Sequence, residues 1–275
     1  MGLRINTNIA SLNAQKNLNS VSDRLGGNYQ RLSSGLRITQ ASDDAAGLGL
    51  SEKLRSKIRS FDQAGRNAQD GISLTQTAEG ALQETSNILN RIRELAVQSA
   101  NGTLGTEERA TIDNEVQSLV SEIDRIADTT EFNGVQLLDG SGTTASIQVG
   151  INSGATQQID IALQDTKVAT LGVDSIDTTT ASGATAALAD IDAAIDAVNT
   201  GRGSLGAAQN RLNSAFGSIQ TARENLSASE SRIRDVDFAS ETAELTRNTV
   251  LQQAATSVLQ QANTQPQIAL SLLRG

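Results

Sequence analysis

The chain has 275 residues, a formal net charge of −9, no Cys, His or Trp, and 2% aromatic residues. The missing Cys excludes disulfides and thiolate chemistry, and the missing His removes the usual general base near neutral pH and the commonest zinc ligand. We therefore expect no enzyme activity, cofactor or metal. The negative charge argues against nucleic-acid binding, which needs a basic face. We also expect no membrane span, because no stretch is long and apolar enough.

The first third of the chain predicts two helices. The first runs from Ile5 to about Leu32, and Ser33-Ser34-Gly35 ends or bends it. The second begins at Ser42, a favourable N-cap residue, and continues to about Ser99. Three glycines inside this helix each cost about 1 kcal/mol relative to Ala. We interpret them as points of close approach to neighbouring helices: Gly65, Gly71 and Gly80.

A third helix is predicted from about Thr106, because apolar residues recur at alternating spacings of four and three, which is a coiled-coil seam. After it the apolar period changes to two on both sides of a polar turn, which predicts a β-hairpin at about 145–164. The following stretch, about 165–187, is rich in Thr, Ser, Ala and Gly. That composition predicts a short variable surface loop.

The next segment carries a seven-residue repeat of apolar residues from Ile191 to Ile233. Such a repeat predicts a long helix that supercoils with a left-handed twist, and its polar interruptions indicate a bundle of several helices. A final helix begins near Asp237, and Pro266 is predicted to kink or end it. The predicted fold class is mainly α: a long antiparallel helical bundle or coiled coil with a small β-hairpin.

Both ends of the chain have uncharged helical segments with an apolar face. Asn248 to Leu273 holds no charged residue, and Ile5 to Gln15 is also uncharged. A solvent-exposed helix would normally use Glu and Lys on its outer face, so we interpret both ends as surfaces buried in an assembly. The alternative is that the two ends simply pair within one chain. The predicted self-assembly residues are Ile5, Ile9, Leu12, Leu18, Val21, Leu25, Leu32, Leu251, Val258, Leu259, Leu270 and Leu273.

Other motifs carry little chemistry. Arg91, Arg93 and Glu94 form a charged cluster that favours a helix face with local ion pairs. The glycines of Ala46–Leu50 lack the preceding strand and the third glycine of a nucleotide loop. A calcium site is not favoured either, because the candidate carboxylates lie in the helical repeat without the loop Gly and terminal Glu that such a site uses. These carboxylates are Asp190, Asp192 and Asp196.

Long, ordered strings in both halves of the chain form a recognisable pattern: INTNIASLNAQKNL, RLSSGLRITQASDDAAGLGLSEKLRSKI, QAGRNAQDGISLTQTAEGAL, LNRIRELAVQSANGT, EIDRIADTTEFNGVQLL, SLGAAQNRL, ENLSASESRIRDVDFASET and ANTQPQIALSLL. Together these strings resemble bacterial flagellin. The middle departs from the pattern, because many flagellins carry large variable outer domains where this chain has only the stretch near 165–187. The chain is therefore similar to a short flagellin with a bare outer surface.

The resemblance implies a structural subunit that polymerises into the filament used for swimming. It implies two domains. Residues 1–42 with 237–275 would form a paired coiled coil in the filament core. Residues 43–236 would form a helical bundle with the hairpin, its long helices at about 43–100, 106–129 and 188–235.

The resemblance also implies partners. The chain would form a homopolymer of many copies and meet an export chaperone, the filament cap and hook-junction proteins. It would leave the cell through the flagellar secretion channel without a cleaved signal peptide and reside in the extracellular filament.

Flagellins of many bacteria are bound by an animal Toll-like receptor, and the residues that match its contact positions are Leu89, Arg91 and Glu115. One alternative is a hook–filament junction protein of the same superfamily, which has similar ends. A secreted coiled-coil adhesin or a flagellin with an embedded enzyme would need additional domains.

Overall fold

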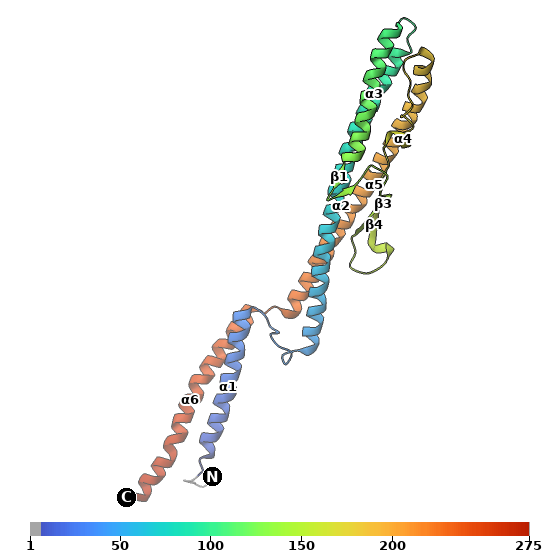
Figure 1. The fold of residues 1–275 in the computed structure, drawn as a ribbon. Helices are drawn as coiled ribbons and strands as arrows, with labels where there is room; N and C mark the ends of the chain where they lie inside the picture. The colour runs from blue at the N-terminus through green and yellow to red at the C-terminus, as the bar shows by residue number, and fades with distance from the viewer. Residues whose placement is uncertain (1–6, 275) are drawn as a thin grey trace. The chain divides into compact units, whose positions relative to one another are not determined.

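The computed structural model describes residues 7–274, with side chains up to Thr264 (Figure 1). No helix in this described part is long and apolar enough to cross a membrane. The elements in chain order are α1 (Ile9–Ser34), α2 (Ala45–Ser99), α3 (Thr106–Thr129), β1 (Glu131–Phe132), β2 (Val135–Gln136), β3 (Thr144–Gln148), the short 3₁₀ helix η1 (Ala155–Gln157), β4 (Gln158–Ala162), α4 (Val168–Leu171), α5 (Ala181–Arg234) and α6 (Phe238–Arg274). The mainly α fold class predicted from the sequence is confirmed.

The chain divides into two compact units. The terminal unit holds the residues up to Ser56 and those from Asn225 onward, and the central unit holds Lys57–Glu224. Both boundaries lie inside helices, because α2 and α5 each contribute to both units. The domain division expected from the resemblance, with boundaries at 42/43 and 236/237, concerns the filament and stays a prediction.

The core of the central unit is built from α2, α3 and α5. The heptad positions of α5 that fall in this unit, from Ile191 to Ile219, are all at most 5% exposed, so the seven-residue repeat is the inner face of the helix. Those from Ile191 to Leu212 pack in one cluster with buried residues of α2, such as Leu89 and Ile92, and of α3, such as Val116. With aromatics so scarce, aliphatic side chains in long parallel rows make this core.

The predicted β-hairpin is present. Strands β3 and β4 pair antiparallel with Ile147 opposite Ile159 and Ala145 opposite Ile161, and both β4 isoleucines are buried. A second, two-residue pair joins β1 and β2 through Asn133-Gly134, whose positive φ angles of 53° and 78° suit a tight hairpin turn. The sequence analysis did not predict this shorter pair.

The prediction of a surface loop at 165–187 is wrong. The segment contains α4 and the start of α5, and it buries Val168, Leu171, Val173 and Ile176 at 8% exposure or less. Helix α3 holds the segment by hydrogen bonds. Asp124 Oδ1 accepts from the Val168 backbone N–H, and Asp113 Oδ1 accepts from the N–H and hydroxyl of Thr178. Small polar residues are typical of loops, but four well-placed aliphatic side chains are enough to dock this one.

Three helix ends can be compared with their predictions. Helix α1 ends as predicted, with Gly35 in the left-handed region at φ 70°. The predicted N-cap Ser42 is wrong, because α2 begins at Ala45 and Asp44 Oδ1 accepts from the Gly47 N–H at 2.8 Å. The prediction that Pro266 could end the last helix is also wrong, since α6 continues to Arg274.

The interior glycines of α2 divide into two kinds. A Cβ at Gly71 would lie 3.0 Å from Ile147 Cγ1 and 3.2 Å from Leu212 Cδ1, whereas a Cβ at Gly80 would meet nothing within 4 Å. Gly71 thus permits the close approach of a neighbouring helix, α5, that the sequence suggested, and it also permits the close approach of the hairpin, which the sequence analysis did not expect. Gly80 does not serve that purpose, because its surroundings are open.

We predict opposite results for these two glycines. Gly80→Ala should stabilise the chain by about 1 kcal/mol through helix propensity alone. Gly71→Ala gains the same propensity but crowds a packed core, which typically costs about 1–3 kcal/mol, so it should be net neutral to destabilising. Urea denaturation followed by circular dichroism measures both free energies of unfolding. Equal stabilisation by the two variants would contradict the close packing at Gly71.

Candidate functional site: the terminal helix pair, a charged face and a pocket

Helices α1 and α6 lie side by side and run antiparallel in the terminal unit (Figure 1). The pair is closed at one end by backbone hydrogen bonds, from Arg37 N–H to Arg234 O at 2.7 Å and from Val236 N–H to Gly35 O at 3.0 Å. At its other end the Asn8 side chain donates to the Ala262 carbonyl at 2.8 Å. The two ends of the chain therefore do pair within one molecule, as the alternative from the sequence allowed.

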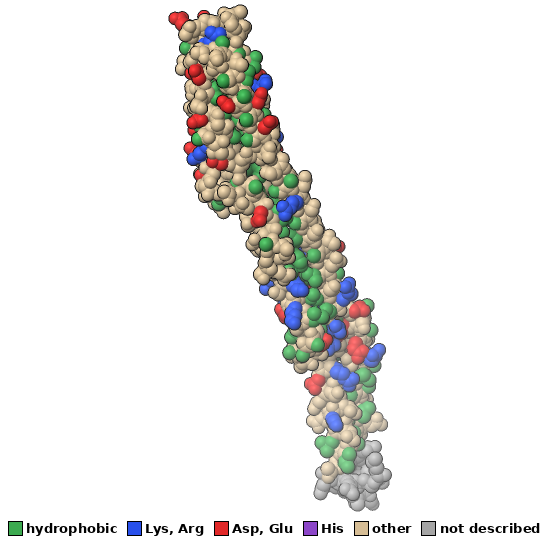
Figure 2. Space-filling model, turned by 90° about the vertical axis from the view of Figure 1, so that its right-hand side faces the viewer, with side chains coloured by type: hydrophobic (Ala, Val, Ile, Leu, Met, Phe, Trp, Pro, Cys, Tyr) green, Lys and Arg blue, Asp and Glu red, His purple; other side chains and the backbone are tan. Residues whose placement is uncertain are grey.

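This pairing buries only part of the apolar surface. Between the helices, Val21 and Leu25 are buried, at 6% and 9% exposure. By contrast, Ile9, Leu12 and Val258 are 56% to 59% exposed. Figure 2 shows apolar side chains on the surface of this pair, between scattered charged groups. The terminal unit thus presents continuous helices with large apolar side chains open to solvent, the kind of surface that marks a protein interface.

The predicted self-assembly residues fall into four groups. Two are buried in the pair, four are exposed, three are partly buried, and three cannot be placed. In that order they are Val21 and Leu25; Ile9, Leu12, Leu251 and Val258; Leu18, Leu32 and Leu259; and Ile5, Leu270 and Leu273, which lie outside the described side chains. The prediction omitted Val250 and Phe238, which are 59% and 55% exposed.

A polar network lies inside the pair, and the sequence analysis missed it. Asn248, 1% exposed, donates from Nδ2 to Asn28 Oδ1 at 2.7 Å, and Asn28, 3% exposed, donates to Glu241 Oε1 at 2.6 Å. Arg31 lies 3.7 Å from the same Glu241 oxygen. A buried Asn pair in an otherwise apolar helix seam costs stability, but it fixes the register because a slip would strand both amides.

The predicted charged cluster lies on α2 and α3 of the central unit. Arg91 donates from Nη2 to Glu115 Oε1 at 2.9 Å and from Nη1 to Glu94 Oε2 at 3.1 Å. Arg91 and Glu115 are 50% and 48% exposed, and their hydrogen bond raises the pKa of Arg91. Exposed pairs of this kind contribute little to stability, so this ion pair does little to hold α2 and α3 together.

Leu89 does not belong to this face. Its side chain is 0% exposed, within the core of the central unit. The resemblance placed Leu89 with Arg91 among the receptor contacts, but residues two apart on a helix point in different directions, so Leu89 is not exposed beside Arg91.

Arg93 pairs with a carboxylate of the rejected calcium motif. Its Nε lies 2.6 Å from Asp192 Oδ1, and this hydrogen bond lowers the pKa of Asp192. Among the described residues no group of His, Cys, Asp or Glu is arranged to hold a metal ion.

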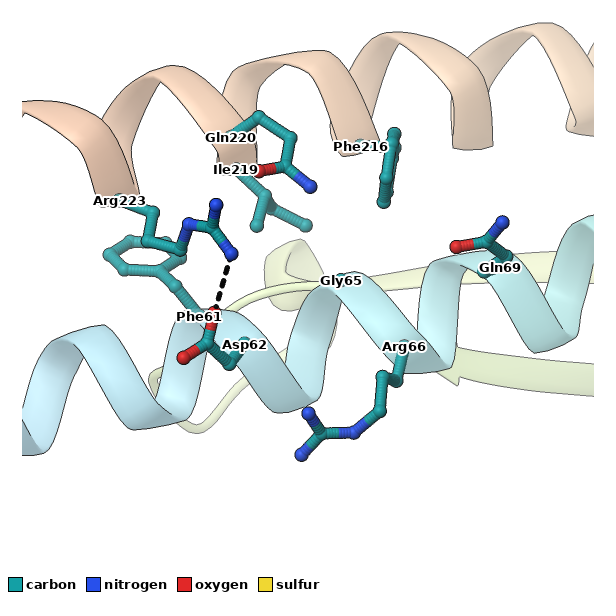
Figure 3. Close-up of a pocket in the computed structure, with 9 residues that line it drawn as sticks. All are labelled: Phe61, Asp62, Gly65, Arg66, Gln69, Phe216, Ile219, Gln220 and Arg223. Carbon is teal, nitrogen blue, oxygen red and sulfur yellow. Dashed lines mark hydrogen bonds and ion pairs between the residues drawn. The ribbon is translucent and has the colours of Figure 1, made fainter.

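A pocket of about 170 Å³ opens between α2 and α5 (Figure 3). Phe61 and Phe216 come from opposite helices, and the Asp62–Arg223 ion pair, 3.0 Å between Oδ1 and Nη1, spans the two. Gly65 and Ile219, both buried, complete the apolar lining. The lining contains no Ser, Cys or His that could form a pair of nucleophile and base, and its remaining residues are the polar Arg66, Gln69 and Gln220.

Comparison with known proteins supports one family. The family model of the bacterial flagellin N-terminal helical region matches residues 5–143. The family model of the bacterial flagellin C-terminal helical region matches residues 188–273. Only residues 144–187, with the β3–β4 hairpin and α4, lie between the two matches. This agrees with the sequence-based expectation of a short form.

Individual relatives extend the match to the whole chain. A flagellin of Halalkalibacterium halodurans is 49% identical over 270 residues, covering 98% of this chain and 99% of the relative. A flagellin of Bacillus subtilis is 45% identical over 308 residues, covering 99% and 100%. The crystal structure of Bacillus cereus flagellin superposes with a TM-score of 0.51 at 33% identity, covering 56% of this chain and 88% of that one.

These matches run through both terminal regions and through the central bundle. A hook–filament junction protein, the alternative from the sequence, is therefore not favoured. The chain belongs to the flagellin family and is a structural subunit of the bacterial flagellar filament.

Proposed function

We propose that this flagellin polymerises through the outward apolar face of the α1–α6 pair. The observation that carries the proposal is the exposure of Ile9, Leu12, Val250 and Val258, each above half, on helices that are already paired. Together with Leu251, these side chains gain burial only when copies of the chain pack against one another. Because such burial is worth about 25 cal/mol per Å², a few large side chains per contact drive assembly.

The same proposal assigns the parts of the chain to the parts of the filament. Residues 1–42 and 237–275 form the core of the filament as paired helices. Residues 43–236 form the bundle outside it. The buried Asn28–Asn248 pair supports this assignment, because copies that share one lattice need every terminal pair in the same register.

We further propose the partners that such a chain needs before and during assembly. An export chaperone covers the exposed apolar side chains of α6 in the cytoplasm, where they would otherwise associate without order. The chain then passes through the flagellar secretion channel, joins the filament outside the cell beneath the filament cap, and meets hook-junction proteins at the base.

A second surface supports recognition by the animal Toll-like receptor for flagellin. We place that contact on Arg91 and Glu115, which are half exposed and hold each other in position. The planar guanidinium offers several donors to carboxylates or carbonyls of a partner. Leu89 acts only through the packing of the helix that carries Arg91, since it lies in the core.

Val258→Lys should block assembly while leaving the chain folded. The side chain is 56% exposed in the single chain, so the lysine is tolerated there, but in the filament it would become a desolvated, unpaired charge. We expect the critical concentration for seeded polymerisation to rise at least about tenfold, which corresponds to ~1.4 kcal/mol per subunit. Val258→Thr, of similar size and uncharged, is the control. Filaments of normal length from the lysine variant would refute the proposed surface.

The register of the terminal pair can be trapped by disulfides, since the native chain has no Cys. Ser11 Oγ lies 2.7 Å from Asn263 Oδ1, so Ser11→Cys with Asn263→Cys should oxidise within one chain in filaments. Ser11→Cys with Thr256→Cys, one heptad away, should not. Electrophoresis separates internally linked monomers from linked dimers. Equal cross-linking of both pairs would mean that the register is not unique.

If the receptor contacts Arg91 and Glu115, removal of either side chain should weaken receptor binding by a similar amount. Arg91→Ala and Glu115→Ala should each weaken binding of monomer to the receptor ectodomain by about 1–3 kcal/mol. Arg125→Ala is the matched control, because Arg125 forms an exposed ion pair with Glu122 on α3 alone. Titration by surface plasmon resonance measures the three affinities. If all three variants bind as tightly as the unmodified chain, the receptor contact lies elsewhere.

A further inference from the structure

The loop that joins α2 to α3 contains the sequence Asn101-Gly102-Thr103 and lies at one end of the central bundle (Figure 1). All three residues are exposed, so water reaches the Asn101 amide. A Cβ built on Gly102 would meet no atom within 4 Å, so the space beside this residue is open. An asparagine followed by glycine is chemically labile, because the glycine nitrogen can approach the asparagine side-chain carbonyl without hindrance from a side chain of its own.

Two groups of the folded chain act on the atoms of that reaction. The Thr103 backbone N–H donates to Asn101 Oδ1 at 3.2 Å and so polarises the side-chain carbonyl that the nitrogen attacks. Arg109 Nη2 donates to the main-chain carbonyl oxygen of Asn101 at 2.7 Å. That oxygen and the Gly102 N–H belong to the same peptide group. The guanidinium therefore stabilises the negative charge that this peptide group carries once the N–H proton has left.

The loop holds Arg109 in this position. Its Nε donates to the Ser99 carbonyl at 2.9 Å, and its Nη1 donates to the Leu104 carbonyl at 2.8 Å. The arginine is half-buried, and no carboxylate forms an ion pair with it in the described part of the chain. Its positive charge is therefore directed at the carbonyl groups of the loop.

The chain contains a second Asn-Gly pair, which lacks both contacts. Asn133-Gly134 forms the β1–β2 turn, with positive φ angles of 53° and 78°. Within the described residues, no hydrogen bond reaches the Asn133 side-chain oxygen, and no arginine donates to the Asn133 carbonyl. The two sites share the reacting residue types and differ in the groups around them, so one serves as the comparison for the other.

We propose that the α2–α3 loop is a self-modification site, at which the folded flagellin converts Asn101 into aspartate and isoaspartate without an enzyme. The Gly102 nitrogen loses its proton to water and attacks Asn101 Cγ. The bond from Cγ to Nδ2 then breaks, and ammonia leaves with a proton taken from water. Water opens the resulting succinimide ring. Breakage of the bond from the ring nitrogen to Cγ gives aspartate, and breakage of its bond to the main-chain carbonyl carbon gives isoaspartate.

Either product changes the loop. Each adds one negative charge close in sequence to Glu107 and Glu108, which are exposed in the first turn of α3. Isoaspartate also routes the backbone through the former side chain, which lengthens the loop by one carbon and moves the carbonyl that Arg109 binds. The fraction of modified loops therefore rises with the age of a subunit.

A comparison of the folded and the denatured chain tests the proposal. The full chain is incubated as a monomer at neutral pH with and without urea, and peptide mass spectrometry measures the loss of asparagine at positions 101 and 133. A fixed backbone normally slows this reaction, because the nitrogen rarely reaches the carbonyl. We expect Asn101 instead to react about tenfold faster in the folded chain than in urea, because its donors are preorganised. Asn133 should react no faster when folded.

An equal or slower reaction of Asn101 in the folded chain would overturn the proposal. Equal acceleration at Asn133 would overturn it too, because that site lacks the two donors. The experiment uses monomers, so its outcome does not depend on the proposed polymerisation.

Substitutions test the assigned roles. Arg109→Gln removes the positive charge and should slow the reaction of Asn101 in the folded chain about fivefold. Arg125→Gln is the matched control, because Arg125 lies on the same helix in an exposed ion pair with Glu122, and it should leave the rate unchanged. Gly102→Ala fits the open space and should also slow the reaction, because its methyl group hinders the attacking nitrogen. Circular dichroism confirms that each variant is folded. An Arg109→Gln variant that reacts as fast as the unmodified chain, or faster, would refute the role of the guanidinium.

Discussion

Burial of the apolar stripe of α5 against α2 and α3 is the constraint on which the central unit depends. With almost no aromatic side chains, each contact buries little area, so the helices must be long for their aliphatic rows to add up. The same need explains the hairpin and the docked segment around α4. Both cover aliphatic rows that the helices leave open, and α3 carboxylates fix the docked segment by capping its backbone N–H groups.

The terminal unit buries only part of its apolar side chains. Two helices alone cannot enclose an apolar seam, so the α1–α6 pair buries one row and exposes another. Although the pair buries little apolar surface, the buried Asn28–Asn248 hydrogen bond favours one register of α1 against α6. A subunit that must join identical copies benefits from this combination. In the single chain its large apolar side chains are exposed, and a buried hydrogen bond joins its two helices.

Two exposed arginines of the central unit differ in their ion-pair partners. The Arg91–Glu115 pair is held but open to solvent, whereas Arg66 is open and lacks an acidic partner among the described residues. The first is the surface on which we propose recognition by the receptor. The second lines the pocket between α2 and α5. Both groups lie on surfaces that the bundle leaves uncovered.

The amino-acid sequence by itself determined the helices, the β3–β4 hairpin, the inner face of α5 and the absence of His- and Cys-based chemistry, because these follow from local periodicity and composition. Tertiary structure alone decided three other features. The segment at 165–187 docks because α3 presents Asp113 and Asp124 to its backbone. The pocket at Gly65 and the Asn28–Asn248 pair each join residues that are more than 140 positions apart in the sequence. A periodic pattern predicts which face of a helix is buried, but it does not predict which other element that face contacts.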